Sequence, residues 1–152
     1  MGIIVGSARH DENGKYTGGK KGDQLQKKST ADLQGECSMQ SFYVHSKGWF
    51  VLRPISKAFA DNLAYAMERA CNNSKIGYSQ GCQRKTADDI DTLLPINVDC
   101  SKLVRDCIYK ATHNDVGNFT TANEIAVLEK SGMFVKHFAF KSLTSTPLYN
   151  GD

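Results

Sequence analysis

The sequence lacks the features that would assign it at once to several large classes of protein. It contains no run of 18 or more apolar residues, which excludes an ordinary membrane-spanning helix. Residues 1–6 carry no basic segment and only a short apolar stretch, unlike a secretory signal. A formal net charge of +3 is too weak for the dense basic stripe of a nucleic-acid-binding protein. We therefore expect a protein made in a cytoplasm, with no nucleic-acid partner and no membrane insertion.

Patterns that pair cysteines or bind metals are also missing. The five cysteines are an odd number and none of them forms a Cys-x-x-Cys pair, which favours free thiols in a reducing compartment over a disulfide framework. The four histidines show no zinc-ligand spacing with them. We expect no metal site and no cofactor. The residues concerned are Cys37, Cys71, Cys82, Cys100, Cys107, His10, His45, His113 and His137.

What is present is an ordinary globular composition. Hydrophobic residues make up 40% of the chain and charged residues 23%, as in many soluble domains. A length of 152 residues favours one domain over residues 1–152. Ile3–Val5 reads as a short strand, whereas residues 10–40 are rich in Gly, Lys, Ser and Thr and predict a loop.

Two β-prone runs and a helix follow. Phe42–Val44 and Trp49–Leu52 flank Ser46–Gly48, a spacing that predicts a hairpin. Ser56 can cap a helix that runs to about Asn73. The apolar stripe of this helix, which we interpret as core, is Ile55, Phe59, Leu63, Met67 and Ala70.

The last third of the chain predicts a second helix, a strand and a turn. Thr121 and Glu124 have the spacing of a capping box, and Gly132 is typical of a helix end. Residues 134–140 read as a strand and residues 148–152 as a turn. The fold class that these elements predict is α+β, with helices segregated from an antiparallel sheet.

A cysteine stands at the start of another predicted helix. Residues 79–97 read as a polar connection, in which Pro95 and Asn97 should interrupt any element. Asp99 then caps a helix whose first residue is Cys100. The residues that share the apolar face of this helix are Cys100, Leu103, Val104, Cys107, Ile108 and Ala111.

The start of a helix is where a thiol gains most as a nucleophile. Unpaired amides and the helix dipole favour the thiolate there. The charge of Asp99 would oppose ionisation of Cys100 unless it is engaged with the capping amides. A structural thiol is the alternative interpretation of Cys100, and it is the one we prefer for Cys107, two turns later without a cap.

The residues around this cysteine resemble a known family. Residues 99–104, DCSKLV, are similar to the Asp-Cys-Ser-x-Leu-Val box of NlpC/P60-type cysteine peptidases and amidases, which are papain-like α+β enzymes that cut bacterial peptidoglycan. Residues 76–80 resemble the upstream segment of that family, in which a tyrosine lines the active site. Residues 119–134 are similar to the second helix of phage-type members, and residues 148–152 to the Gly-Asp turn that opens the next strand. Residues 1–24 resemble the start of peptidoglycan amidohydrolases from phages and prophages of low-GC Gram-positive bacteria.

The resemblance implies a phage or prophage lytic enzyme, or endolysin, that hydrolyses peptidoglycan without metal or cofactor. Cys100 would attack an amide, either as an endopeptidase or as an N-acetylmuramoyl-L-alanine amidase. Tyr78, Asp99 and Ser101 would contact the substrate. The enzyme would be made in the host cytoplasm and would act at the cell wall after release, with or without an additional wall-binding domain or chain.

The chain departs from the family pattern at the catalytic base. In the family, a histidine on the strand after the Gly-Asp turn deprotonates the cysteine, and this sequence ends at Asp152. We expect that base beyond Asp152, in a catalytic domain that is truncated here, with His113 or His137 as alternatives inside the chain. Lys102 stands where many members have Gly or Ser, and we expect it on an exposed helix turn.

Two other functions stay open at this point. Without a base, the chain would be a catalytically inactive cell-wall-binding or regulatory module. A cysteine peptidase or transferase that acts on a protein substrate is the other alternative.

Overall fold

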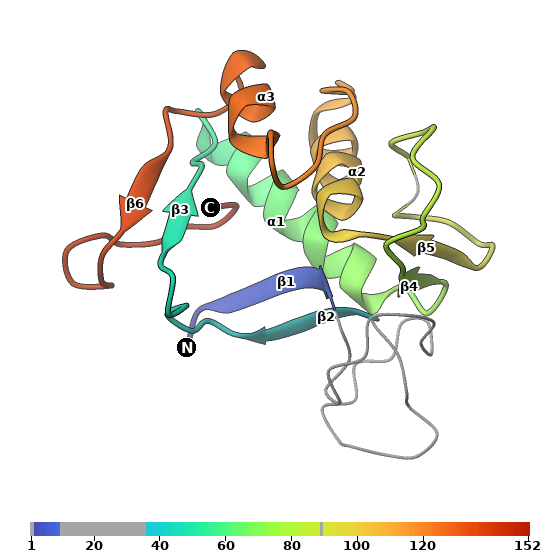
Figure 1. Cartoon of the computed structure of the whole chain (residues 1–152), viewed down its shortest axis with the longest axis horizontal. Coiled ribbons are helices and arrows are strands. Elements are labelled where there is room, and N and C mark those ends of the chain that lie inside the picture. The colour runs from blue at the N-terminus through green and yellow to red at the C-terminus, as the bar shows by residue number, and fades with distance from the viewer. Residues whose placement is uncertain (1, 10–35, 89) are drawn as a thin grey trace.

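The computed structural model describes residues 2–9, 36–88 and 90–152, and these ranges contain three helices and six strands. The mixture agrees with the predicted α+β class, and none of these helices is long and apolar enough to cross a membrane. The strands are β1 (Ile4–Arg9), β2 (Glu36–Ser41), β3 (Trp49–Val51), β4 (Ile76–Tyr78), β5 (Ile96–Val98) and β6 (Phe138–Phe140). The helices are α1 (Lys57–Asn72), α2 (Cys100–Thr112) and α3 (Glu124–Lys130), and Figure 1 shows their arrangement.

Four strands form a mixed sheet in the order β1-β2-β4-β5. The first two pairings are antiparallel and the pairing of β4 with β5 is parallel. The prediction of a wholly antiparallel sheet is therefore wrong at this edge, because the long connection after β4 brings the chain back to run in the same direction. Asn97, which we expected to interrupt any element, lies inside β5. The register pairs Ile4 with Ser41, Arg9 with Glu36, Glu36 with Gly77 and Tyr78 with Val98.

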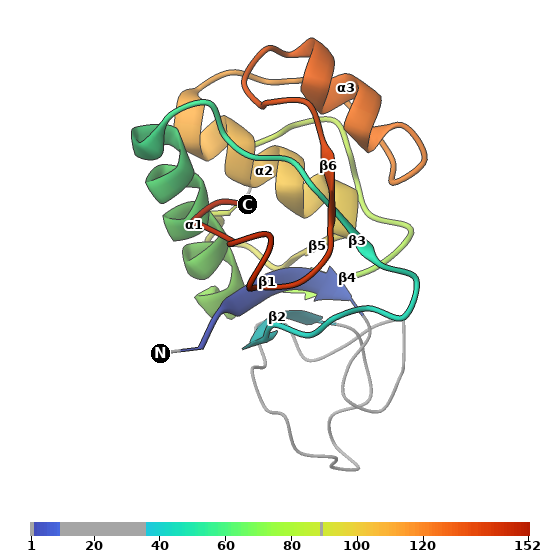
Figure 2. The same cartoon turned by 90° about the vertical axis from the view of Figure 1, so that its left-hand side faces the viewer.

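Helices α1 and α2 lie side by side on one face of this sheet (Figure 2). Ser56 caps α1 as predicted, since its Oγ accepts a hydrogen bond of 3.2 Å from the amide of Phe59. Strand β1 passes so close to α1 that a Cβ at Gly6 would lie 2.4 Å from Cγ of Met67, so a larger residue there would have to displace the Met67 side chain. Ile55 is 61% exposed, contrary to the predicted stripe, because it precedes the cap and lies outside the helix. The buried core here comprises Ala8, Cys37, Ala66, Ala70, Cys71, Ile76, Tyr78, Ile90, Val98, Leu103 and Cys107.

A second apolar cluster joins α3 to α1 and α2. It is formed by Phe59, Ile108, Phe119, Leu128 and Phe134. The short helix α3 ends as predicted, with Gly132 at φ +72°.

The capping box predicted for α3 does not form. Asn123 precedes the helix and no side chain caps its amides. The Oδ1 atom of Asn123 instead accepts a hydrogen bond of 2.8 Å from the amide of Thr120, which makes a local turn before the helix. The prediction based on Thr121 and Glu124 is therefore wrong, although a helix does begin at Glu124.

The predicted hairpin is also wrong. Strand β3 pairs with β6, about 90 residues later in the chain, and Trp49 lies opposite Phe140. The turn before β3 exists, because the amide of Gly48 donates to the carbonyl of His45 at 2.8 Å. Residues 42–44 form no strand, and their link to β3 is a hydrogen bond of 2.9 Å from the Trp49 indole to the carbonyl of Tyr43.

Two more boundaries differ from the sequence analysis. The region predicted as a loop over residues 10–40 contains most of β2, whose polar sequence gives no strand signal although Cys37 and Ser38 are both buried. The part of that loop at residues 10–35 lies outside the described residues. Strand β6 covers only Phe138–Phe140 of the predicted strand, and Phe134 makes an isolated bridge with Pro54.

The predicted turn at residues 148–152 is present and is tied to the rest of the molecule. Arg53 holds the Asp152 carboxylate with two hydrogen bonds, of 2.8 and 2.6 Å, and its guanidinium lies 4.3 Å from the ring centroid of Tyr149. Gly151 has φ +77°, and a Cβ there would lie 2.6 Å from the carbonyl oxygen of Ala60. The turn therefore packs directly on α1.

Candidate functional site

Cys100 is the first residue of α2, as the sequence predicts. Asp99 is the N-cap, and its Oδ1 atom accepts a hydrogen bond of 2.8 Å from the amide of Lys102. The Cys100 side chain is partly exposed, and its Sγ lies 3.9 Å from the Oγ of Ser101. The thiol therefore belongs to the first helical turn, whose amides have no acceptor within the helix itself.

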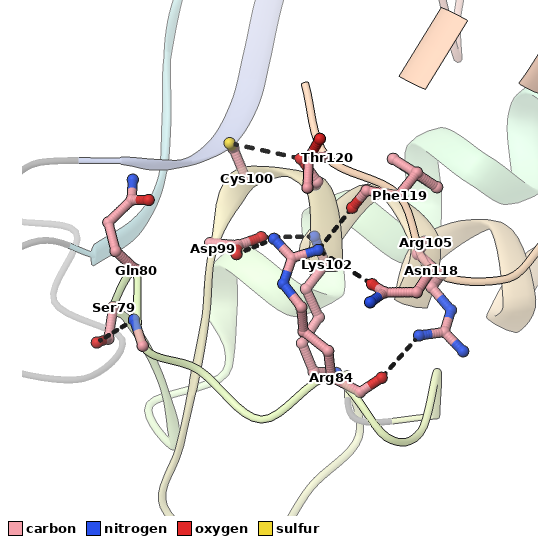
Figure 3. Close-up of polar contacts among 12 residues, drawn as sticks. Ser79, Gln80, Arg84, Asp99, Cys100, Lys102, Arg105, Asn118, Phe119 and Thr120 are labelled. Atoms are coloured by element: carbon pink, nitrogen blue, oxygen red, sulfur yellow. Dashed lines mark hydrogen bonds and ion pairs between the residues drawn. The ribbon is translucent and has the colours of Figure 1, made fainter. Parts of the chain in front are cut away.

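The second oxygen of the Asp99 carboxylate forms an ion pair with Arg84, a residue that the sequence analysis did not identify. Arg84 Nη1 also donates to the carbonyl of Phe119 at 2.6 Å and to Oδ1 of Asn118 at 3.1 Å. Figure 3 shows the guanidinium between Asp99 and this segment. Asp99, which is only 4% exposed, thus has both oxygens engaged and its charge compensated.

Lys102 is buried, contrary to the expectation of an exposed helix turn. It is 2% exposed, and its Nζ forms an ion pair of 2.6 Å with Asp106, one turn along α2. The same Nζ donates to the carbonyl of Thr86 at 3.3 Å. The prediction is wrong because an i,i+4 partner and the segment that covers α2 provide the polar contacts that make burial of a lysine possible.

Arg105 extends this row of charged residues along α2. It binds Asp115 through two hydrogen bonds of 2.7 and 2.6 Å, and its Nη1 donates to the carbonyl of Arg84 at 2.9 Å. Hydrogen bonds from Arg105 are the main reason that the pKa of Asp115 lies below its usual range. Two connecting segments, on either side of α2 in the sequence, are therefore fixed against the polar side of the helix.

Tyr78 and Ser101, two of the predicted substrate contacts, are nearly fully buried. Tyr78 pairs with Val98 in the parallel strands β4 and β5, directly before the chain enters α2. Its hydroxyl accepts a hydrogen bond from the Gln80 side chain. The structure brings these residues to the same region as Cys100, and substrate contact by Tyr78, Asp99 or Ser101 stays a prediction.

None of the three histidines that the structure describes hydrogen-bonds to Cys100. His113 follows the opposite end of α2, about 20 Å from Cys100 at 1.5 Å per residue, which excludes it as the base. His137 binds Glu129 at 2.7 Å, next to β6, and Figure 1 shows β6 on the side of the molecule away from β4 and β5. The ring of His45 accepts a hydrogen bond from the amide of Lys47. His10 lies outside the described residues.

The other cysteines near the site have different environments. The pKa of Cys82 is raised, first by burial and then by the charge of Asp99, while Arg84 acts in the opposite direction. The pKa of Cys107 is raised well above its ordinary value by complete burial, with a contribution from Cys71, and the prediction that Cys107 belongs to the core is confirmed. Among the described residues, no group of three or more His, Cys, Asp or Glu side chains could hold a metal ion.

Comparison with known proteins gives one match. A family model described as an endolysin-like domain matches residues 5–152, nearly the whole chain. No curated protein and no solved structure matches significantly.

Proposed function

Because the chain belongs to the endolysin-like domain family, we propose that it hydrolyses an amide bond of bacterial peptidoglycan, with Cys100 as nucleophile, as a phage or prophage lytic enzyme. Endolysins are phage enzymes that degrade the cell wall, so family membership supports the substrate. The observation that supports Cys100 as the nucleophile is its partly exposed thiol at the first residue of α2, directly after a side-chain cap. The narrower assignment to the NlpC/P60 type, with a papain-like fold over one domain at residues 1–152, rests on the resemblance of residues 99–104.

The proposed chemistry is acyl transfer to sulfur. The Cys100 thiolate attacks the amide carbonyl, and the backbone amide of Cys100 donates to the developing oxyanion at the positive end of α2. The leaving amine takes a proton from a histidine, and water then hydrolyses the thioester. Tyr78, Asp99 and Ser101 are the proposed substrate contacts. The resemblance implies that the histidine follows the turn at residues 148–152. The peptide bonds of the wall and the bond to muramic acid are both candidate substrates.

The proposal also includes a place of action. The enzyme would be made in the host cytoplasm and reach the wall after release. An additional wall-binding domain or chain would supply affinity without changing the role of Cys100.

The test is clearing of purified Gram-positive cell walls, followed as loss of turbidity. It uses the 152-residue chain, a form extended past Asp152 along its gene, and the Cys100→Ala variant of each. Cys82→Ala is the matched control, because it removes a neighbouring thiol and leaves Cys100 in place. We expect the extended form and its Cys82→Ala variant to clear walls, and Cys100→Ala to reduce the rate to background, at least about 10³-fold, as for loss of a nucleophile.

The contrary outcomes are also informative. Clearing that survives Cys100→Ala would contradict the role of Cys100. Absence of clearing by every form, together with binding to the same walls, would favour the alternative of a catalytically inactive wall-binding module. That alternative draws on the observation that none of the three described histidines hydrogen-bonds to Cys100.

A further inference from the structure

Arg84 is the one cation that joins the cap of α2 to the segment at residues 118–119, as far as the described residues show. It forms an ion pair with Asp99 and donates to the carbonyl of Phe119 and the side chain of Asn118. The planar guanidinium suits this task, because it can meet several acceptors in fixed directions. Its side chain is 23% exposed, and that of Asp99 is 5% exposed, so the pair is partly shielded from water.

The position of Asp99 creates an electrostatic problem for a nucleophilic cysteine. Its carboxylate caps α2 directly before Cys100 and is poorly hydrated, so its negative charge opposes the formation of a second negative charge on the neighbouring sulfur. A positive partner at Asp99 removes this opposition. Arg84 is that partner.

We propose that Arg84 is a positioning residue for Cys100, which compensates the charge of Asp99 and so keeps the Cys100 thiol able to ionise at the start of α2. The inference rests on the proposed function of Cys100 and adds a residue to it. Arg84 acts through Asp99 and needs no contact with the substrate.

Within the part of the chain that the structure describes, no other cation forms an ion pair with the Asp99 carboxylate. Lys102 is engaged with Asp106, one turn further along α2. Asn118 and Phe119 bring no titratable group, and Cys82 is itself under the influence of the pair. Asp99 raises the pKa of Cys82 and Arg84 lowers it, so the two charges already act in opposite directions on one thiol beside the site.

The test is the rate of alkylation of Cys100 by iodoacetamide as a function of pH, with peptide mass spectrometry to separate the five cysteines. The variants are Arg84→Gln, Arg84→Lys, Asp99→Asn and the double variant Arg84→Gln/Asp99→Asn. Asparagine is a good N-cap, so Asp99→Asn removes the charge and retains the cap. Circular dichroism and protection of the buried Cys107 verify the fold of each variant.

We expect Arg84→Gln to lower the alkylation rate of Cys100 at pH 7 about tenfold and to move its rate–pH curve to higher pH, because Asp99 is left uncompensated. Arg84→Lys should stay within about threefold of wild type, because it keeps the charge. In the Asp99→Asn background, Arg84→Gln should change the alkylation rate less than about threefold, since the charge that Arg84 compensates is gone.

An unchanged rate–pH curve in folded Arg84→Gln would overturn the inference. So would an equal loss in Arg84→Lys, or a full tenfold loss in the Asp99→Asn background. These results are independent of wall clearing. Failure of the proposed function would appear as clearing by Cys100→Ala, whereas failure of the inference would appear in the alkylation of Cys100 alone.

Discussion

Cys100 and Cys107 lie on the same helix, two turns apart and on one face, but in different surroundings. Cys100 is partly exposed at the first residue of α2, next to a side-chain cap and unpaired amides. Cys107 is fully buried in the apolar core, and burial raises its pKa well above the ordinary value. The comparison shows that two cysteines on one helix face differ in exposure because only the first stands at the helix start.

The polar side of the same helix holds a buried ion pair. Lys102 and Asp106 lie roughly opposite the face that carries the two cysteines, and both are almost inaccessible to water. On this side of the helix, the connecting segments bring polar groups to its start. On the other side, Cys107 packs with Cys71 and its apolar neighbours. The first turns of α2 are therefore covered on both faces, by polar contacts on one and by the core on the other.

The largest expected effect is the difference in reactivity between the two thiols. Iodoacetamide at pH 7.5 should alkylate Cys100 in the folded protein at least about 10⁴-fold faster than Cys107. Cys107 reacts only when the core opens, and burial raises the pKa of its thiol. Quenched alkylation with peptide mass spectrometry measures both rates in one sample. Comparable rates would mean that the end of α2 opens locally and that the contrast between the two cysteines is wrong.

The next effect breaks the buried ion pair of α2. Lys102→Met should lower the free energy of unfolding by about 3 kcal/mol, because the Asp106 carboxylate stays buried without its cationic partner. Urea unfolding measures this loss, and alkylation of Cys107 should accelerate about 100-fold as the folded state becomes less stable.

The matched control is Lys102→Met/Asp106→Leu. Replacing both charges by apolar side chains of similar size should recover most of the lost stability. If Lys102→Met alone is neutral, the pair contributes little to the stability of the folded state.

The parts of the fold that the sequence predicts are those fixed by local chemistry. Ser56 and Asp99 cap helices as expected, since each cap needs only one side chain and the amide three residues later. Gly132 takes the left-handed conformation that its position at a helix end indicates. The same logic failed at Thr121 and Glu124, because the neighbouring Asn123 forms a turn with Thr120 and replaces the predicted box.

Long-range partners could not be predicted in the same way. Strand β3 has a turn directly before it, yet its partner β6 lies about 90 residues later, and nothing local to Trp49 specifies Phe140. Arg84 lies in a polar connection without periodicity, so the sequence holds no signal that it would meet Asp99. The spacing of Lys102 and Asp106 does indicate an i,i+4 pair, but not its burial, which depends on the segment that covers α2.

The smallest expected effect is the dependence of the free energy of unfolding on pH, which tests the buried environment of Cys107. Because the folded-state pKa of Cys107 is raised, the folded protein holds this proton at pH values where the unfolded chain has lost it. The stabilisation is fully present below the unfolded thiol pKa of about 8.5, and it falls by up to about 1.4 kcal/mol per pH unit above it. Urea unfolding from pH 7 to pH 10 measures the slope. Cys107→Ala lowers stability at every pH but should reduce this slope. Equal slopes in wild type and Cys107→Ala would show that ionisation of Cys107 does not limit stability in alkali.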